Sequence, residues 1–333
     1  MASGCYGHSE VHTPNIDRIA AAGVRFNHTY CQSPVCVPAR GSIITGQYPH
    51  THGARILQDA LPADTRTIAH HFGQYGYQTA AIGKMHFVDE TQKHGFDYRV
   101  ELGSFRKTLT NSEWQELRRD QDGFGTMGRP SKLSSRYFQD TYYADETVRY
   151  LCEERYPDKP FILWSSYFMP HTPLVPMLEY FNLYNPKTLT LPKRSENALE
   201  SGFEGHLVRS KQRGWYGQTD EELGCALAGY YGNISQMDAC VGKVLDTLYD
   251  LGLYQNTIIV YTSDHGEMAG GHRMWTKHNM YEQSVCVPLI VRLPDDRDAG
   301  TAQNHLIEHI DLYPTLAELC GLPVPKNIQG RSF

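Results

Sequence analysis

The sequence contains no long apolar run, no excess of positive charge and no Cys-x-x-Cys pair. A membrane-spanning helix needs about 20 consecutive apolar residues, and no stretch of the 333 residues approaches that length. The formal net charge is -6, and residues of both signs are interspersed, so the sequence has no cluster of basic residues typical of a nucleic-acid-binding protein. We therefore expect neither a membrane nor a nucleic acid as partner.

The eight cysteines are scattered, and their spacings do not match a zinc site built from thiolates. A chain of this length does not need disulfides to fold, so most cysteines are predicted to be small buried hydrophobic residues. The first residues, Met-Ala-Ser-Gly-Cys, have neither the basic nor the apolar region of a signal peptide. The compartment stays open between cytoplasm and periplasm.

Helical and extended patterns alternate along the chain. Extended segments are predicted at residues 24–26, 77–82, 161–168, 257–262 and 287–292, and helices at residues 16–22, 67–75, 142–155, 222–251 and 312–320. Strands separated by helices predict an α/β fold with a mostly parallel central sheet and helices on both faces. Two polar regions, roughly 103–135 and 177–220, are too long for plain connections and are either surface excursions or walls of a substrate pocket.

Reactive side chains follow three of the predicted strands at the point where each strand ends. Lys84 and His86 follow the second strand, His171 follows the third, and Asp264 and His265 follow the fourth. In open parallel sheets, ligands bind beyond the carboxyl ends of the strands. We therefore expect these side chains to share one site.

The most informative segment is Cys-Val-Pro-Ala-Arg at residues 36–40. Proline suits the first turn of a helix, and a helix amino terminus favours a bound anion through its free N–H groups and its dipole. Arg40 lies one turn beyond Cys36 on the same side and supplies a fixed cation. A nucleophile and an oxyanion could therefore meet here.

This segment resembles the signature of the formylglycine-dependent type I sulfatases of the alkaline phosphatase superfamily, in which the Cys of Cys-x-Pro-x-Arg is oxidised to formylglycine. The similarity continues through Thr-Gly-Gln-Tyr-Pro-His at residues 45–50. Further segments that resemble the family, in its order, lie at residues 11–18, 83–86, 170–173, 262–267, 275–277 and 287–289. The resemblance spans nearly the whole chain and implies an alkaline-phosphatase-like fold.

The resemblance implies a sulfuric ester hydrolase that acts on a small-molecule or carbohydrate sulfate ester. A formylglycine-generating enzyme would convert Cys36 into an aldehyde. One hydroxyl of the aldehyde hydrate attacks sulfur, and the other later expels sulfate, a step that a plain thiol cannot perform. The runner-up interpretations are a phosphonate or phosphate ester hydrolase that uses the same site, and an inactive binding protein that keeps the fold.

The family resemblance also implies roles for the neighbouring residues. Arg40 and Lys84 would hold the hydrate and the sulfate oxygens, and His86 would take the proton when the sulfated intermediate collapses. His171 and Lys277 would bind the sulfate and assist the leaving oxygen, as general acid or as electrostatic clamp.

By the same resemblance, Asp264, His265 and the modified Cys36 are the expected ligands of a divalent metal. The metal would polarise the sulfate and lower the pKa of the hydrate hydroxyl. Carboxylate ligands suit calcium best, and the His ligand leaves manganese or magnesium open.

The family pattern also predicts sequence beyond both ends. Sulfatase-like sequences normally begin with a buried strand that ends in a metal-ligating Asp pair, just upstream of the Gly-Cys-Tyr-Gly found here at residues 4–7, and no Asp precedes Asp17. Relatives also continue beyond the position of Phe333 into an antiparallel subdomain. We expect residues 1–333 to form one catalytic α/β domain without that strand and subdomain, with weak metal binding and little turnover. The alternative is a natural short form whose metal is held by Asp264, His265 and modified Cys36 alone.

Overall fold

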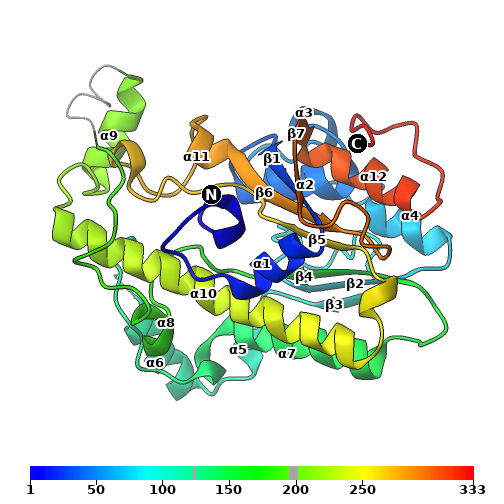
Figure 1. Cartoon of the computed structure of the whole chain (residues 1–333), viewed down its shortest axis with the longest axis horizontal. Coiled ribbons are helices and arrows are strands. Elements are labelled where there is room, and N and C mark those ends of the chain that lie inside the picture. Colours follow the sequence, from blue (N-terminus) through cyan, green and yellow to red (C-terminus); the bar gives the residue numbers. More distant parts are fainter. Residues whose placement is uncertain (123–124, 195–201) are drawn as a thin grey trace.

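The computed structural model describes residues 1–122, 125–194 and 202–333 (Figure 1). Among these residues the strands form a four-stranded sheet in the order β5-β6-β1-β7 and a three-stranded sheet in the order β3-β2-β4. The strands are β1 (Val24–Tyr30), β2 (Gln78–Gly83), β3 (Tyr98–Val100), β4 (Phe161–Ser166), β5 (Ile259–Thr262), β6 (Cys286–Arg292) and β7 (Thr301–Glu308).

Parallel pairing predominates in both sheets. β2 runs parallel to β3 and to β4, and β1 runs parallel to β7. Only β6, among the described strands, runs antiparallel to its neighbours β1 and β5. The predicted α/β fold is confirmed, but the central sheet is divided: β4 and β5 each end a sheet and face each other.

Helices cover both faces of the sheets (Figure 1). One layer contains α1 (Pro14–Ala21), α7 (Gln139–Arg149) and the long α10 (Asp220–Asp250); the other contains α2 (Cys36–Thr45), α3 (Pro49–His52), α4 (Ile68–Gln74) and α12 (Leu312–Leu319). The shorter peripheral helices are α5 (Ser104–Lys107), α6 (Asn111–Gln121), α8 (Leu178–Phe181), α9 (Glu204–Gln212) and α11 (Glu282–Val285).

The alternation of side chains along β2 explains the two layers. Successive residues of a strand point to opposite faces of the sheet. Ala80 and Ile82 accordingly pack in the apolar cluster that includes α1, α7 and α10, whereas Ala81 packs in the cluster of α2, α4 and α12. A strand that is buried on both faces has a continuous run of apolar residues, and this pattern predicted β2 from the sequence.

The sequence predicted the positions of the long helices and strands well, but it missed short or solvent-exposed strands. β3 and β7 were not predicted, because β3 has three residues and most side chains of β7 face solvent. The two polar regions contain α5, α6, α8 and α9, and their residues 123–124 and 195–201 lie outside the described residues. Among the described residues, no helix is long and apolar enough to cross a membrane.

α1 is held at its amino end by a side chain of α10. The buried Asp238 carboxylate accepts hydrogen bonds from the backbone N–H groups of Asn15 (3.1 Å) and Ile16 (2.8 Å) and from Asn15 Nδ2 (2.8 Å). These N–H groups belong to the first turn of α1 and have no partner within the helix itself. Asp238 therefore acts as the cap that the local sequence of α1 does not provide, because the Thr13 side chain does not cap the helix.

Asp238→Ala is expected to lower the free energy of unfolding by about 2 kcal/mol, because it leaves buried N–H groups without acceptors. Asp246→Ala on the same helix is the control: Asp246 pairs with Arg18 at 2.9 Å but is largely exposed, so its removal is expected to cost less than about 1 kcal/mol. Urea denaturation of both variants measures the difference. Equal losses in the two variants would contradict the capping role.

Candidate active site

Cys36 is the first residue of α2, and every residue of this helix is buried. Val35 before it is extended, and Pro38 lies in the first turn, as the sequence predicted. The helix ends at Gly46, whose φ of 65° is readily adopted only by a residue without a Cβ. α2 thus brings a thiol and the free N–H groups of a helix amino terminus to one point inside the protein.

The Cys36 thiol is surrounded by cationic and imidazole groups. Its Sγ lies 3.1 Å from Nε2 of His265 and 3.7 Å from Nζ of Lys84. Burial would raise the pKa of the thiol, but hydrogen bonds from His265 and His86 and the charge of Lys84 lower it to about 3. The surroundings of Cys36 therefore stabilise negative charge at this position.

Arg40, one turn along α2, joins the helix to three strand ends. Its Nε donates to Asp264 Oδ2 at 2.8 Å, beyond β5, and its Nη1 donates to Ser166 Oγ at 2.9 Å, at the end of β4. Nη1 also donates to the backbone carbonyl of Lys84, beyond β2. Burial would raise the pKa of the Asp264 carboxyl, but His265, Arg40 and Lys84 hold it well below its usual range.

Lys84 and His86 follow β2 through a turn that needs glycine. Gly83 has a φ of 90°, and a Cβ there would collide with the carbonyl oxygen of Ser166. Burial lowers the pKa of Lys84 below its ordinary value, and the Asp264 carboxylate opposes that shift. His86 contacts Cys36, and its Nδ1 is buried without a hydrogen-bond partner among the described residues.

His171 and the buried Lys277 face the same space from two further loops. His171 Nδ1 donates to the backbone carbonyl of Thr172 at 2.8 Å, which leaves Nε2 free. Burial, followed by the charges of Lys277 and Lys84, lowers the pKa of His171 to about 4. The imidazole is therefore neutral near pH 7 when no anion is bound.

Two carboxylates, the buried Asp140 and the partly buried Glu267, position these loops, and sequence reasoning did not single them out. Asp140 on α7 accepts hydrogen bonds from the backbone N–H groups of Phe168 and Met169, both at 2.7 Å, in the segment that leads to His171. Glu267 accepts from the backbone N–H of Thr276, directly before Lys277. Asp140 lies in the first turn of α7, where an acidic residue is common in any helix and does not indicate a function. Glu267 lies within the segment 262–267 that resembles the family.

Cys36, Asp264 and His265 form a group that could hold a metal ion, since their ligand atoms all lie within 4.8 Å of one another. His265 Nδ1 donates to the backbone carbonyl of Gly266 at 2.8 Å. This hydrogen bond leaves Nε2 directed toward Cys36, which is the arrangement usual for a metal-binding histidine. The donor set fits a divalent cation, although it contains a single carboxylate.

The structure brings every residue predicted for the site to this one location at the carboxyl ends of β2, β4 and β5. The family profile described as Sulfatase matches residues 1–322. The chain belongs to the sulfatase family. The predictions of the family and of a sulfuric ester hydrolase are thereby confirmed.

Individual members of the sulfatase family resemble the chain over nearly its full length. It is 28% identical to an arylsulfatase of Clostridium perfringens, over 99% of this chain and 74% of that protein. It is 30% identical to a choline-sulfatase of Rhizobium meliloti, over 94% of this chain and 63% of that protein. Among solved structures, the phosphonate monoester hydrolase of Silicibacter pomeroyi has the same fold, with a TM-score of 0.80, 24% identity, and coverage of 100% of this chain and 74% of that chain.

The position of Asp140 predicts a pH dependence of stability. Burial raises the pKa of this carboxyl to about 6, against the hydrogen bonds of Phe168 and Met169, which lower it. Between pH 4 and pH 6 the folded protein keeps a proton that the unfolded chain releases, so this contribution to stability falls as pH rises through that window.

Asp140→Asn removes that titration, so the parent should lose up to roughly 3 kcal/mol relative to the variant between pH 4 and pH 7. Denaturation of both proteins at several pH values measures the change. Asp145→Asn on the same helix is the control, since Asp145 is half exposed in its pair with Lys243. A constant difference between parent and Asp140→Asn across this range would contradict the prediction.

Proposed function

We propose that this protein hydrolyses sulfate esters through a formylglycine hydrate derived from Cys36, with the help of a divalent metal. The observation that carries the proposal is the position of Cys36 at the amino end of a buried helix, between His265 and Lys84. A buried thiol in such surroundings is activated as a nucleophile and adjoins a place for an anion.

The charges around Cys36 favour a sulfate group. Arg40, Lys84 and Lys277 are buried cations, while the Asp264 carboxylate is already paired with Arg40. Buried charge needs compensation, and a bound sulfate ester would supply the negative charge that these cations lack. The cluster is therefore suited to an anionic group transferred from an alcohol.

In the proposed reaction the formylglycine hydrate supplies two hydroxyls, one to attack sulfur and one to expel sulfate and restore the aldehyde. Arg40 and Lys84 hold the hydrate and the sulfate oxygens. His86, which contacts the Cys36 side chain, takes the proton of the second hydroxyl.

Assistance to the leaving group is assigned to His171 and Lys277. Lys277 supplies positive charge. His171 is neutral in the free site, and the negative charge of a bound ester would raise its pKa, so that the protonated ring could donate to the leaving oxygen.

Asp264 and His265 would hold the divalent metal together with the modified Cys36. A bound metal would polarise the sulfate and favour ionisation of the hydrate hydroxyl. We propose calcium because Asp264 is a hard oxygen ligand, with manganese or magnesium as the alternatives that the nitrogen ligand allows. A formylglycine-generating enzyme is the partner that this chemistry requires.

A phosphonate or phosphate ester hydrolase is the second candidate, because a phosphonate monoester hydrolase shares this fold. The two functions are distinguished by the rates at which protein purified from its native host hydrolyses an aryl sulfate and an aryl phosphonate under the same conditions. A higher kcat/KM on the sulfate supports the proposal, and a higher value on the phosphonate selects the alternative. Turnover of neither ester by the complete, metal-loaded enzyme would favour the inactive binding protein.

Cys36→Ala and Cys36→Ser are expected to abolish steady turnover by the complete enzyme, produced in the native host. Serine could be sulfated once at most, because it has no second hydroxyl to expel the product. Cys31→Ala is the matched control, since Cys31 is also buried but packs against Val285 and Val287. Wild-type turnover by Cys36→Ala would disprove the mechanism.

His171→Ala and Lys277→Ala are expected to slow esters of poor leaving groups much more than activated aryl esters. A good leaving group departs without acid assistance, so only the poor ones depend on these side chains. The measurement is kcat/KM for a series of aryl sulfates that differ in the pKa of the released phenol. An equal loss across the series would mean that both residues only bind the sulfate.

A further inference from the structure

His86 lies in the loop that leaves the end of β2 and returns to the sheet at β3. The residues on either side of it, Met85 and Phe87, are both buried in the apolar cluster of α2, α4 and α12. His86 itself has a φ of 58°, in the left-handed region that residues other than glycine adopt at a cost in energy. The contact of His86 with Cys36 therefore depends on how firmly the loop holds Met85 and Phe87 in the core.

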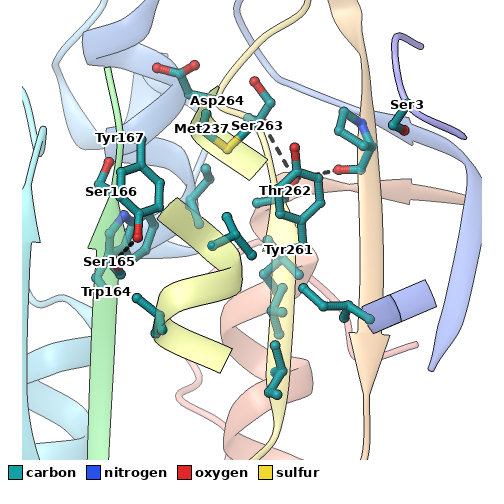
Figure 2. A pocket seen from close by; sticks show the side chains of 18 of the residues that line it. Ser3, Trp164, Ser165, Ser166, Tyr167, Met237, Tyr261, Thr262, Ser263 and Asp264 are labelled. Carbon is teal, nitrogen blue, oxygen red and sulfur yellow. Dashed lines mark hydrogen bonds between the residues drawn. The ribbon is translucent and has the colours of Figure 1, made fainter. Parts of the chain in front are cut away.

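The beginning of this loop is attached to the end of β4. The backbone carbonyl of Lys84 accepts hydrogen bonds from Ser166 Oγ at 2.6 Å and from Arg40. Figure 2 shows Ser166 on β4, which runs toward the end of the pocket at which Asp264 lies. These hydrogen bonds hold the chain just before His86, so the orientation of His86 also requires the part of the loop that follows it to be held.

Arg99 of β3 holds the part of the loop that follows His86. Its Nη1 donates to the backbone carbonyls of Glu90 at 3.2 Å and Gln92 at 2.7 Å, and its Nη2 pairs with Glu90 Oε2 at 3.0 Å. The guanidinium also lies over the ring of Phe87, 5.3 Å from its centroid. The Arg99 side chain is nearly inaccessible to solvent, and the planar fork of donors makes contacts that a lysine could not reproduce together.

His94 closes a second side of the Phe87 ring. The two rings meet edge to face, with their centroids 4.5 Å apart. His94 is buried, and its backbone carbonyl accepts a hydrogen bond from Thr67 Oγ1 at 2.6 Å. Phe87 is thus enclosed by a cation and an imidazole ring as well as by the apolar cluster, directly beside His86.

We propose that Arg99 is a positioning residue that holds His86 against the side chain of residue 36, acting through Phe87 and the loop. The inference rests on the proposed function, in which His86 acts in the second half of the reaction. There the second hydroxyl gives its proton to His86, the C=O bond of the aldehyde forms again, and the C–O bond to sulfate breaks with its electron pair on the departing sulfate. Loss of Arg99 would displace the base without removing it.

The two halves of the reaction respond differently to a displaced His86. kcat/KM reports the steps up to release of the alcohol, whereas kcat also includes the collapse of the sulfated intermediate. In the complete enzyme from the native host, Arg99→Met is expected to lower kcat on the order of 10–100-fold, because a small misplacement of a catalytic group has effects of this size. kcat/KM for activated aryl sulfates should change by less than about 3-fold, since the first half does not require this base.

The collapse of the intermediate does not involve the alcohol that has already left. In Arg99→Met, kcat should therefore become the same for activated aryl sulfates that differ in the pKa of the released phenol. Rapid mixing should show a burst of phenol equivalent to the formylglycine-bearing sites. Phe87→Leu, which removes the ring that Arg99 covers, is expected to change kcat in the same direction. Arg99→Lys keeps the charge without the fork and should restore part of kcat.

Arg292 of β6 provides a matched control. It is fully buried, donates to the backbone carbonyls of Tyr254 at 2.7 Å and Thr257 at 3.3 Å, pairs with Asp296 at 2.7 Å, and lies over the Tyr254 ring. Tyr254 and Thr257 precede β5, whereas Asp264 follows it. Arg292→Met is expected to lower kcat and kcat/KM by the same factor, because a loss of folded enzyme reduces both alike.

An equal fall of kcat and kcat/KM in Arg99→Met, as in the control, would mean that Arg99 only stabilises the fold and would overturn the proposal. Unchanged kinetics would overturn it too, as would a loss of kcat/KM confined to poor leaving groups, which would place the effect in departure of the alcohol. Wild-type enzyme that hydrolyses no aryl sulfate would instead refute the proposed function, and the role of His86 with it. Should Arg99→Met fail to fold, Phe87→Leu and Arg99→Lys provide the same comparison.

Discussion

The site depends on the buried ion pair between Arg40 and Asp264. The two side chains are nearly inaccessible and lie 2.8 Å apart. Arg40 also donates to Ser166 and to the backbone of Lys84, so one guanidinium fixes α2 against the ends of β2, β4 and β5. Because removal of one partner would leave an unpaired buried charge, at a cost of about 3–5 kcal/mol, this pair holds both the architecture and the position of Cys36 one turn earlier.

The same arrangement sets the electrostatics of the cluster. Hydrogen bonds from His265 and His86, followed by the charge of Lys84, favour an ionised thiol at Cys36. Burial, followed by the charges of Lys277 and Lys84, favours a neutral ring at His171. A bound anion would raise the pKa of His171 and so favour its protonated form. Binding of the ester and protonation of this general acid are therefore linked through the charges of Lys84 and Lys277.

Sequence reasoning reached the strand-end residues because their signals are local. Lys84, His171 and Asp264 each follow an apolar run, and Cys36 and Arg40 share a short motif. Asp140 and Ser166 escaped it because their partners are backbone groups distant in sequence, such as Phe168 N–H and the Lys84 carbonyl.

Peptide mass spectrometry tests the central claim most directly. Trypsin cleaves after Arg25 and Arg40, so residues 26–40 form one peptide that contains both Cys31 and Cys36. In protein from the native host, treated with a thiol-alkylating reagent, we expect alkylation at Cys31 and an aldehyde in place of the thiol at Cys36. Alkylation at both positions in active protein would contradict the assignment of Cys36 as the formylglycine precursor.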